Sequence, residues 1–272
     1  MSTALSESRL PRSTMFARSV RAEVSKEWST GFQAGGAVLV SLVTLGVALG
    51  IGSVSRTADA RWNSGQGILQ PQFALVGLLT VGVVLLLLAA AWSVLGERVP
   101  RTAGLSAIAV PSRSVLVLSK TTVAAVGTLV LTAVLVPLAL IVTASAAAGA
   151  IAWPSELLEA GGARFWLVLP FVLAAYAAMA VAVAALLDSV PLTIGVLLVW
   201  YLLVEDWLGR VPALEAAASL LPVSAGLSLA GAQGDAAALP GGVAGGVAAL
   251  VGATVLLVAL ACFRVERRDV RS

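Results

Sequence analysis

Six long apolar runs constrain this chain more than any other feature of its sequence. They lie at about residues 34–54, 73–95, 121–151, 165–187, 192–208 and 239–263. A bilayer core about 30 Å thick is crossed by roughly 20 apolar residues in a helix, so each run is about long enough to span a membrane. Within hydrocarbon the backbone must satisfy its own hydrogen bonds, which an α-helix does. We therefore predict an all-α integral membrane protein with six transmembrane helices.

The composition agrees with this class and argues against several others. Of the 272 residues, 59% are hydrophobic and 11% are charged. In soluble domains about 45–50% of residues are apolar and about 25% are charged. The chain has no histidine, the commonest general base, and its one cysteine cannot form an internal disulfide. No pair of catalytic carboxylates or cluster of nucleophiles is evident. We expect no catalytic, cofactor-binding or metal-binding residues, and no nucleic-acid partner.

The basic residues predict an orientation. Thirteen of the 17 arginines and lysines lie before the first run, between the second and third runs, or after the last run. In a six-span chain these regions share one side, which the excess of positive charge assigns to the cytoplasm. We expect cytoplasmic segments at 1–33 and 264–272 and a transmembrane domain at 34–263. That domain has a cytoplasmic segment at 96–120 and an outer loop at 209–238. The many Ala, Val, Leu and Gly residues and the two lysines suggest a GC-rich prokaryotic genome, so we expect the inner (cytoplasmic) membrane of a prokaryotic cell.

The residues before the first span form an amphipathic pattern. Apolar residues recur at i,i+4 spacing through Phe16, Val20, Val24, Trp28 and Phe32, with the charged residues off this stripe. Such a helix suits the inner surface of a membrane, where basic residues also favour anionic lipids. We predict an interfacial helix that also contacts a partner. Its candidate interface residues are Phe16, Val20, Arg21, Val24 and Trp28.

A polar stretch, Leu95–Lys120, separates the second and third spans. An acidic residue, Glu97, follows the second span, Pro111 precedes the basic Arg113 by two residues, and Lys120 opens the third span. This spacing resembles that of permease subunits of type-2 ABC (ATP-binding cassette) exporters. The resemblance covers most of the chain. It includes the basic amphipathic N-terminus, the six spans, the "LLP" before the last span and the "RVERRDV" tail.

The resemblance implies a role for the polar stretch. In that family the cytoplasmic segment between spans two and three forms a short coupling helix that docks on a separate ATPase subunit. The residues carried over to this role are Glu97, Arg101, Thr102, Leu105, Ile108, Pro111 and Arg113. Where the family often has Gly-Thr, this chain has Arg101-Thr102, preceded by Pro100. The resemblance further implies a homodimer, or a heterodimer with a paralogous permease, embedded in the lipid bilayer and bound to ABC ATPase subunits.

The sequence lacks a phosphate-binding loop of its own. A Walker A motif reads G-x-x-x-x-G-K-[ST], in which backbone amides cradle the phosphates and the lysine reaches their oxygens. Lys120 precedes a threonine, but Ser119 stands where the motif requires glycine. We therefore expect ATP and Mg²⁺ to bind a separate ATPase chain, with no cofactor on this one.

The region before the last span is partly apolar but broken by proline and glycine. Apolar segments of about 10–14 residues favour re-entrant or interfacial placement, so we expect two short helices at the outer membrane surface. The resemblance implies such elements as well. Glu205 and Asp206, at the end of the fifth span, either line an outer vestibule or mark the interface, and we favour the interface. Small-residue pairs, Gly46/Gly50, Gly241/Gly245 and Gly242/Gly246, predict close helix approach.

The spans carry no charged residue at their centres. Ion-coupled carriers place titratable or ion-binding groups within the membrane, so the sequence favours an ATP-driven exporter of an amphipathic, lipid-like or drug-like substrate. Two other transport classes stay open. One is a haem or cytochrome-maturation export permease, against which the missing histidine argues. The other is an ATP-independent secondary transporter or channel.

Overall fold

The computed structural model describes residues 12–30, 32–62, 71–97, 113–147, 162–187, 189–233 and 236–268. Within these ranges every regular element is helical, as expected. The longer helices are α1 (Arg12–Thr30), α2 (Phe32–Trp62), α3 (Val83–Leu95), α5 (Arg113–Ala146), α7 (Gly162–Leu187), α8 (Val190–Val199) and α12 (Gly242–Arg268). The shorter ones are η1 (Pro71–Leu75), η2 (Leu78–Gly82), η3 (Trp200–Val204), α9 (Glu205–Gly209), α10 (Glu215–Ala218), α11 (Pro222–Leu229) and η4 (Ala236–Ala238).

In the part of the chain that the structure describes, six stretches are long and apolar enough to cross a membrane. They are Ala34–Thr57, Leu78–Leu95, Arg113–Ala146, Arg164–Leu187, Val190–Gly209 and Gly242–Arg267. Each corresponds to one of the six apolar runs of the sequence, so the predicted number of spans is confirmed. The chain is a multi-pass membrane protein built from helices.

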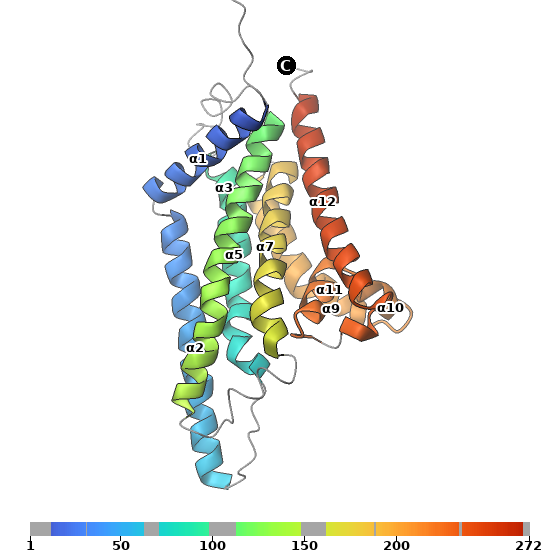
Figure 1. Cartoon of the computed structure of the whole chain (residues 1–272). Coiled ribbons are helices and arrows are strands. Elements are labelled where there is room, and N and C mark those ends of the chain that lie inside the picture. Colours follow the sequence, from blue (N-terminus) through green and yellow to red (C-terminus); the bar gives the residue numbers. More distant parts are fainter. Residues whose placement is uncertain are drawn as a thin grey trace, which may run out of the picture.

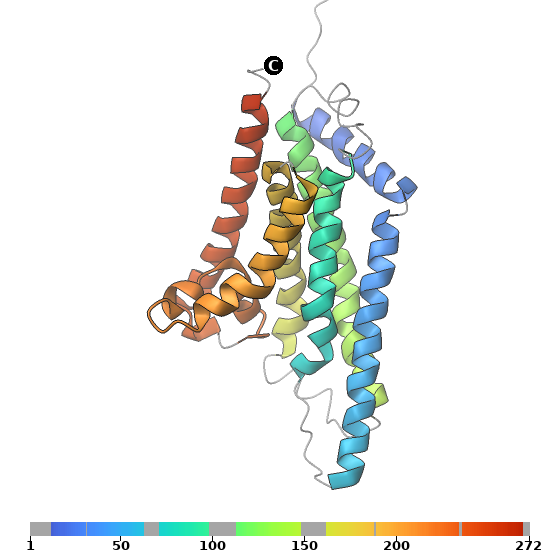
Figure 2. The same ribbon diagram turned by 180° about the vertical axis from the view of Figure 1, so that it is seen from behind.

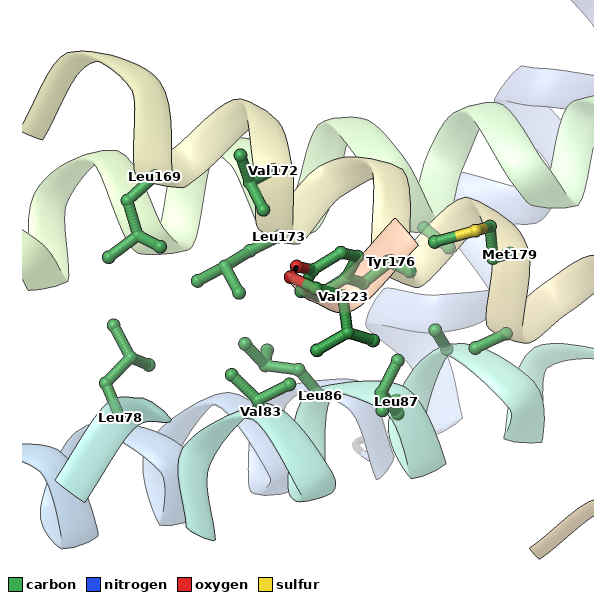
Figure 3. Close-up of a cluster of buried hydrophobic side chains, with 14 of the residues drawn as sticks. Leu78, Val83, Leu86, Leu87, Leu169, Val172, Leu173, Tyr176, Met179 and Val223 are labelled. Carbon is green, nitrogen blue, oxygen red and sulfur yellow. Dashed lines mark hydrogen bonds between the residues drawn. The ribbon is translucent and has the colours of Figure 1, made fainter. Parts of the chain in front are cut away.

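The helix α7 lies at the centre of the bundle and packs against α3, α5 and α12. In its span 67% of the most apolar stretch is buried, compared with 22% in the α2 span and 17% in the α12 span. Ala177, Ala180 and Ala184 of α7 are almost fully buried, and such small side chains let transmembrane helices approach closely. Larger side chains of α7, including Leu173 and Tyr176, face α3 across the core shown in Figure 3.

The helix α1 lies across one end of the bundle instead of continuing the line of α2 (Figure 1). It contacts both α2 and α5. The C-terminal end of α12 lies at the same end of the molecule, as the view from behind also shows (Figure 2). The basic residues of α1 and those at the end of α12 therefore share one end of the molecule.

Two of the spans contain a π-helical turn. These turns are η2 in the second span and η3 in the fifth. A π turn interrupts the regular i→i−4 hydrogen-bond pattern of an α-helix and is frequent at functional sites. Here the two turns are in contact, because the Tyr201 hydroxyl of η3 donates a hydrogen bond to the backbone carbonyl of Leu79 in η2.

The predicted outer loop contains the two short helices α10 and α11, followed by the single turn η4. These elements lie at the opposite end of the bundle from α1 (Figure 1). The helix α11 packs against both α7 and α12. At the contact with α12, a Cβ atom added to Gly246 would lie 3.1 Å from the Leu229 side chain. Close approach at this predicted glycine is confirmed.

The helices α2 and α5 approach closely at Gly52 and not at the predicted pair. A Cβ atom at Gly52 would lie 2.6 Å from the carbonyl oxygen of Thr143 and 2.7 Å from Cβ of Ala146, both on α5. A Cβ atom added to Gly46 or Gly50 would meet no atom within 4 Å. The expectation of close helix approach at that pair is therefore wrong within this chain. Both lie on the exposed side of α2, whereas Gly52 is buried.

We predict that Gly52→Ala destabilises the protein by about 1–3 kcal/mol, because the added methyl group forces α2 and α5 apart. Gly50→Ala is the matched control, since it adds the same atom to the exposed side of the same helix. That variant should be neutral or gain up to about 1 kcal/mol from helix propensity. Thermal unfolding of the purified protein in detergent checks the order, and equal melting temperatures for the two variants would contradict it.

Candidate functional site

The side chain of Lys120 is buried within α5, with 3% of its surface exposed. Its ammonium group donates to Glu97 Oε1 at 2.7 Å, to Glu23 Oε2 at 2.9 Å and to the carbonyl of Ser93 at 3.0 Å. An ammonium group has three N–H donors, so each donor has an acceptor. Removing a charge from water costs several kcal/mol unless it is paired and hydrogen-bonded, and these contacts offset that cost.

The partners of Lys120 come from helices that are distant in sequence. Glu23 lies on α1, and Glu97 follows the end of α3 in a turn. Lys26, also on α1, forms a second ion pair with Glu97. We call Glu23, Lys26, Glu97 and Lys120 the ion cluster. It joins α1, α3 and α5 at the end of the bundle that α1 crosses.

A hydroxyl pair extends the contact between α1 and α5. Ser19 Oγ lies within hydrogen-bonding distance of Ser119 Oγ, at 2.8 Å, and both side chains are buried. Ser19 and Glu23 stand one helical turn apart, so they share one face of α1. This polar face contacts α5. The sequence pattern had instead predicted the neighbouring apolar stripe as the interface of α1.

The predicted interface residues of α1 lie away from the ion cluster. Phe16 and Val20 are half-buried, Arg21 is exposed, and Val24 is 39% exposed. Trp28 belongs to α1, but its side chain lies outside the described residues. The apolar stripe is therefore partly available for contact with a membrane surface, because the bundle is held through a different face.

Only the two ends of the predicted coupling segment are described. Glu97 is 6% exposed and belongs to the ion cluster, and Arg113 is half-buried at the start of α5. The other predicted coupling residues, Arg101, Thr102, Leu105, Ile108 and Pro111, lie outside the described residues. In the chain, residues 98–112 connect the turn that ends with Glu97, after α3, to the start of α5 at Arg113.

The pKa values of two acidic groups near the ion cluster, Glu97 and Glu27, are shifted in opposite directions. Burial alone would raise the pKa of Glu97, but the ammonium groups of Lys120 and Lys26 outweigh it and hold that pKa below its ordinary value of 4.5. Burial, together with the nearby Glu23 carboxylate, raises the pKa of Glu27. Glu97 is thus held as a carboxylate, whereas Glu27 takes up a proton more readily.

The sequence did not lead us to predict Glu23 as a site residue. It also did not lead us to predict that Lys120 joins three helices. The available signal was a lysine at the start of a long apolar run, since an ionisable residue in a membrane span usually pairs with an oppositely charged group. Glu23 lay off the apolar stripe of α1, which made it a possible partner. Helical periodicity does not indicate which face of α1 meets α5, so the pair was not identified.

Another buried carboxylate, that of Glu205, lies at the opposite end of the bundle. Glu205 is 3% exposed and accepts hydrogen bonds from Trp200 Nε1 at 2.7 Å, Val223 N at 3.1 Å and Ser224 N at 2.6 Å. Ser224 Oγ adds a fourth contact at 3.0 Å. The two amides belong to the first turn of α11, where backbone N–H groups lack helical acceptors and favour an anion. Its carboxylate therefore holds α11, a role that the expected interface position did not include. The side chain of Asp206 is outside the described residues.

The same short helix is held from the side by α7. The Tyr176 hydroxyl donates a 2.7 Å hydrogen bond to the carbonyl of Val223, and Figure 3 shows the two residues meeting above the α3 side chains. A Cβ atom at Gly226 would lie 2.4 Å from the Tyr176 hydroxyl. The helix therefore depends on glycine at this position to approach α7.

Among the residues that the structure covers, no group of three or more His, Cys, Asp or Glu side chains is arranged to hold a metal ion. The ion cluster has two ammonium groups among its four members, which opposes the binding of a cation there. Its arrangement suits a mechanical role, the joining of three helices.

We predict that Lys120→Met lowers the free energy of unfolding by about 3–5 kcal/mol, because it leaves two buried carboxylates without their shared ammonium group. Lys26→Gln is the matched control in the same cluster, since the Lys26 side chain is 42% exposed and exposed ion pairs contribute about 1 kcal/mol or less. Thermal unfolding in detergent measures both. A loss for Lys120→Met no larger than that for Lys26→Gln would show that the cluster adds no stability.

The depressed pKa of Glu97 predicts a pH dependence. Its contribution to stability is complete at pH values above the ordinary carboxyl pKa of 4.5 and is lost as the pH falls through the lowered pKa. Melting temperature measured between neutral and acidic pH should therefore fall less steeply in Glu97→Gln, which is less stable than the wild type at neutral pH. Parallel curves for the two proteins would contradict the prediction.

Comparison of the chain with models of known protein families, with curated proteins and with solved structures finds no match. Two features are central: the ion cluster at the α1 end of the bundle and the Glu205 contact with α11 at the other end.

Proposed function

We propose that this chain is the membrane-spanning permease subunit of an ATP-binding cassette exporter. In this proposal two such subunits, identical or paralogous, enclose a path for an amphipathic, lipid-like or drug-like substrate. Separate ATPase subunits bind the α1 end and drive transport. The spacing of Glu97, Pro111, Arg113 and Lys120 resembles that of such permeases, and the architecture of six spans is compatible with them.

The observation that carries the proposal is the ion cluster. It connects the interfacial helix α1 to the end of α3, where residues 98–112 begin, and to the first turns of α5, where they end. Breaking a buried ion pair costs about 3–5 kcal/mol, so the three helix ends tend to move together. An ATPase that displaced α1 or residues 98–112 would therefore shift two membrane spans at once.

The distribution of charge supports an energy source outside the membrane. In the described spans the charged residues lie toward the helix ends, and the buried Lys120 and Glu205 are both held by hydrogen bonds within the chain. Carriers coupled to ions or protons use titratable groups or ion ligands within the membrane. This distribution favours an ATP-driven mechanism over a secondary transporter.

The proposed orientation follows from the shared end of α1 and α12. Both helices carry basic residues there, including Arg18 and Arg21 of α1 and Arg264 and Arg267 of α12. By the positive-inside rule this end faces the cytoplasm, where ATP is available. We assign the protein to the cytoplasmic membrane of a prokaryotic cell, with both termini inside.

Purification in mild detergent from its native membrane tests the proposal. The tagged chain should retain an ABC ATPase, and the reconstituted complex should move substrate only when ATP is hydrolysed. The Lys120→Met variant serves as a control, because disruption of the α1 contact should weaken retention of the ATPase. Transport by the purified chain alone in response to an ion gradient would overturn the proposal.

We predict that Glu97→Gln leaves membrane insertion intact but reduces the coupling of ATP hydrolysis to transport, because α1 and α3 lose their charged link. A bulky charged residue in place of Ala107 should have the same effect through the contact with the ATPase. Glu266→Gln, at an exposed position of α12, is the control. The measurement is transported substrate per ATP hydrolysed, and a wild-type ratio in both test variants would exclude a coupling role for this segment.

A further inference from the structure

A pocket of about 240 Å³ lies in the half of the bundle that contains α11. Five segments contribute to its wall: α3, α7, the α8–η3 stretch, α11 and α12. Wall residues include Leu87, Met179, Ala180, Val196, Val223 and Leu257. Leu87, Met179 and Val223 are drawn in Figure 3, where Val223 lies between the α7 and α3 side chains.

The polar groups of the wall are already satisfied within the protein. The Tyr176 hydroxyl donates to the Val223 carbonyl, the Tyr201 hydroxyl to the Leu79 carbonyl, and the indole N–H of Trp200 to Glu205. A polar ligand would leave its own hydrogen bonds to water without obtaining equivalent ones here, which is unfavourable by about 1–3 kcal/mol per group. The pocket therefore selects an apolar ligand.

The most exposed residues of the pocket wall belong to the fifth span. Of the wall residues, Val196 and Trp200 are the most exposed, at 37% and 39%, while Tyr176, Met179 and Ala180 are buried. The neighbouring exposed residues of the fifth span are the apolar Val199, Leu202 and Leu203. A ligand that passes Val196 and Trp200 thus comes from the lipid around the fifth span.

We propose that this pocket binds one alkyl chain of a membrane lipid, which enters beside Val196 and Trp200. The volume limits the ligand: a cavity of about 150 Å³ holds a benzene molecule, so about 240 Å³ holds part of an alkyl chain and not a whole lipid. The headgroup stays outside the pocket. The inference goes beyond the proposed transport function, because chain binding requires no ATPase.

The bound chain has a structural consequence for α11. It contacts Tyr176 and Val223, the two residues whose hydrogen bond holds α11 on α7. Filling the pocket adds apolar contacts on both sides of that hydrogen bond and removes an empty space, whose presence is unfavourable in a packed interior. Lipid occupancy therefore strengthens the attachment of α11.

Photolabelling of the whole protein in phosphatidylcholine vesicles tests the proposal. The probe is a phosphatidylcholine with a diazirine near the end of one acyl chain, and labelled residues are mapped by mass spectrometry. We expect labels on Tyr176 and Met179, which are 1% and 8% exposed and are not reached from bulk lipid. Labels confined to exposed residues such as Val199 and Leu203 would overturn the proposal.

Two variants of α8 sharpen this test. Val196→Phe fills the entrance and should abolish labelling of Met179, whereas Val199→Phe, the matched control outside the pocket wall, should leave it unchanged. Val196→Ala widens the entrance and should increase the labelling, so the test remains decisive if Val196→Phe fails to fold. Equal labelling of Met179 in all of these proteins would refute entry beside Val196. A diazirine fatty acid that labels Met179 when the phospholipid does not would refute the assignment to a membrane lipid.

Discussion

One end of this molecule depends on the buried ammonium group of Lys120 and on the ion pairs that it forms. A lysine inside an apolar helix is tolerated only where oppositely charged or carbonyl groups replace water. Here Glu23 and Glu97 supply those groups from α1 and from the end of α3. The position of α1 across the bundle, and the joint attachment of both ends of residues 98–112, follow from this one requirement. The charges of the ion cluster bind one another, an arrangement that suits the joining of helices.

The six spans were predictable because their length and apolar character are local properties of the sequence. Each apolar run must cross the bilayer as a helix, whatever its neighbours are. The central position of α7 was harder to predict from the sequence, since its alanines do not differ in hydropathy from those of exposed spans. The close approach at Gly52, in place of Gly46 and Gly50, depends on which side of α2 meets α5. That side is a tertiary property, which spacing alone does not determine.

The candidate site was predictable in part for the same reason. Glu97 and Arg113 were identified from a pattern along the chain, but the pairing of Lys120 with Glu23 joins positions 97 residues apart. Glu205 was assigned to the interface because it ends an apolar run beside an aromatic residue. Its real partners are the amides of α11, which return to the fifth span after a change of direction. A sequence pattern identifies a carboxylate near a span end but not a helix that folds back over it.

The two buried charged sites differ in the order in which their partners are synthesised. Glu23 and Glu97 both precede Lys120 in the chain, so the lysine enters the membrane with its acceptors already made. Glu205 meets the reverse situation, because the Val223 and Ser224 amides follow it by 18 and 19 residues. Before α11 is synthesised, Trp200 is the only one of the described donors to Glu205 that is present in the chain. The contacts of Lys120 can therefore form once α5 has been synthesised, whereas those of Glu205 with α11 form only after the residues that follow the fifth span have been synthesised.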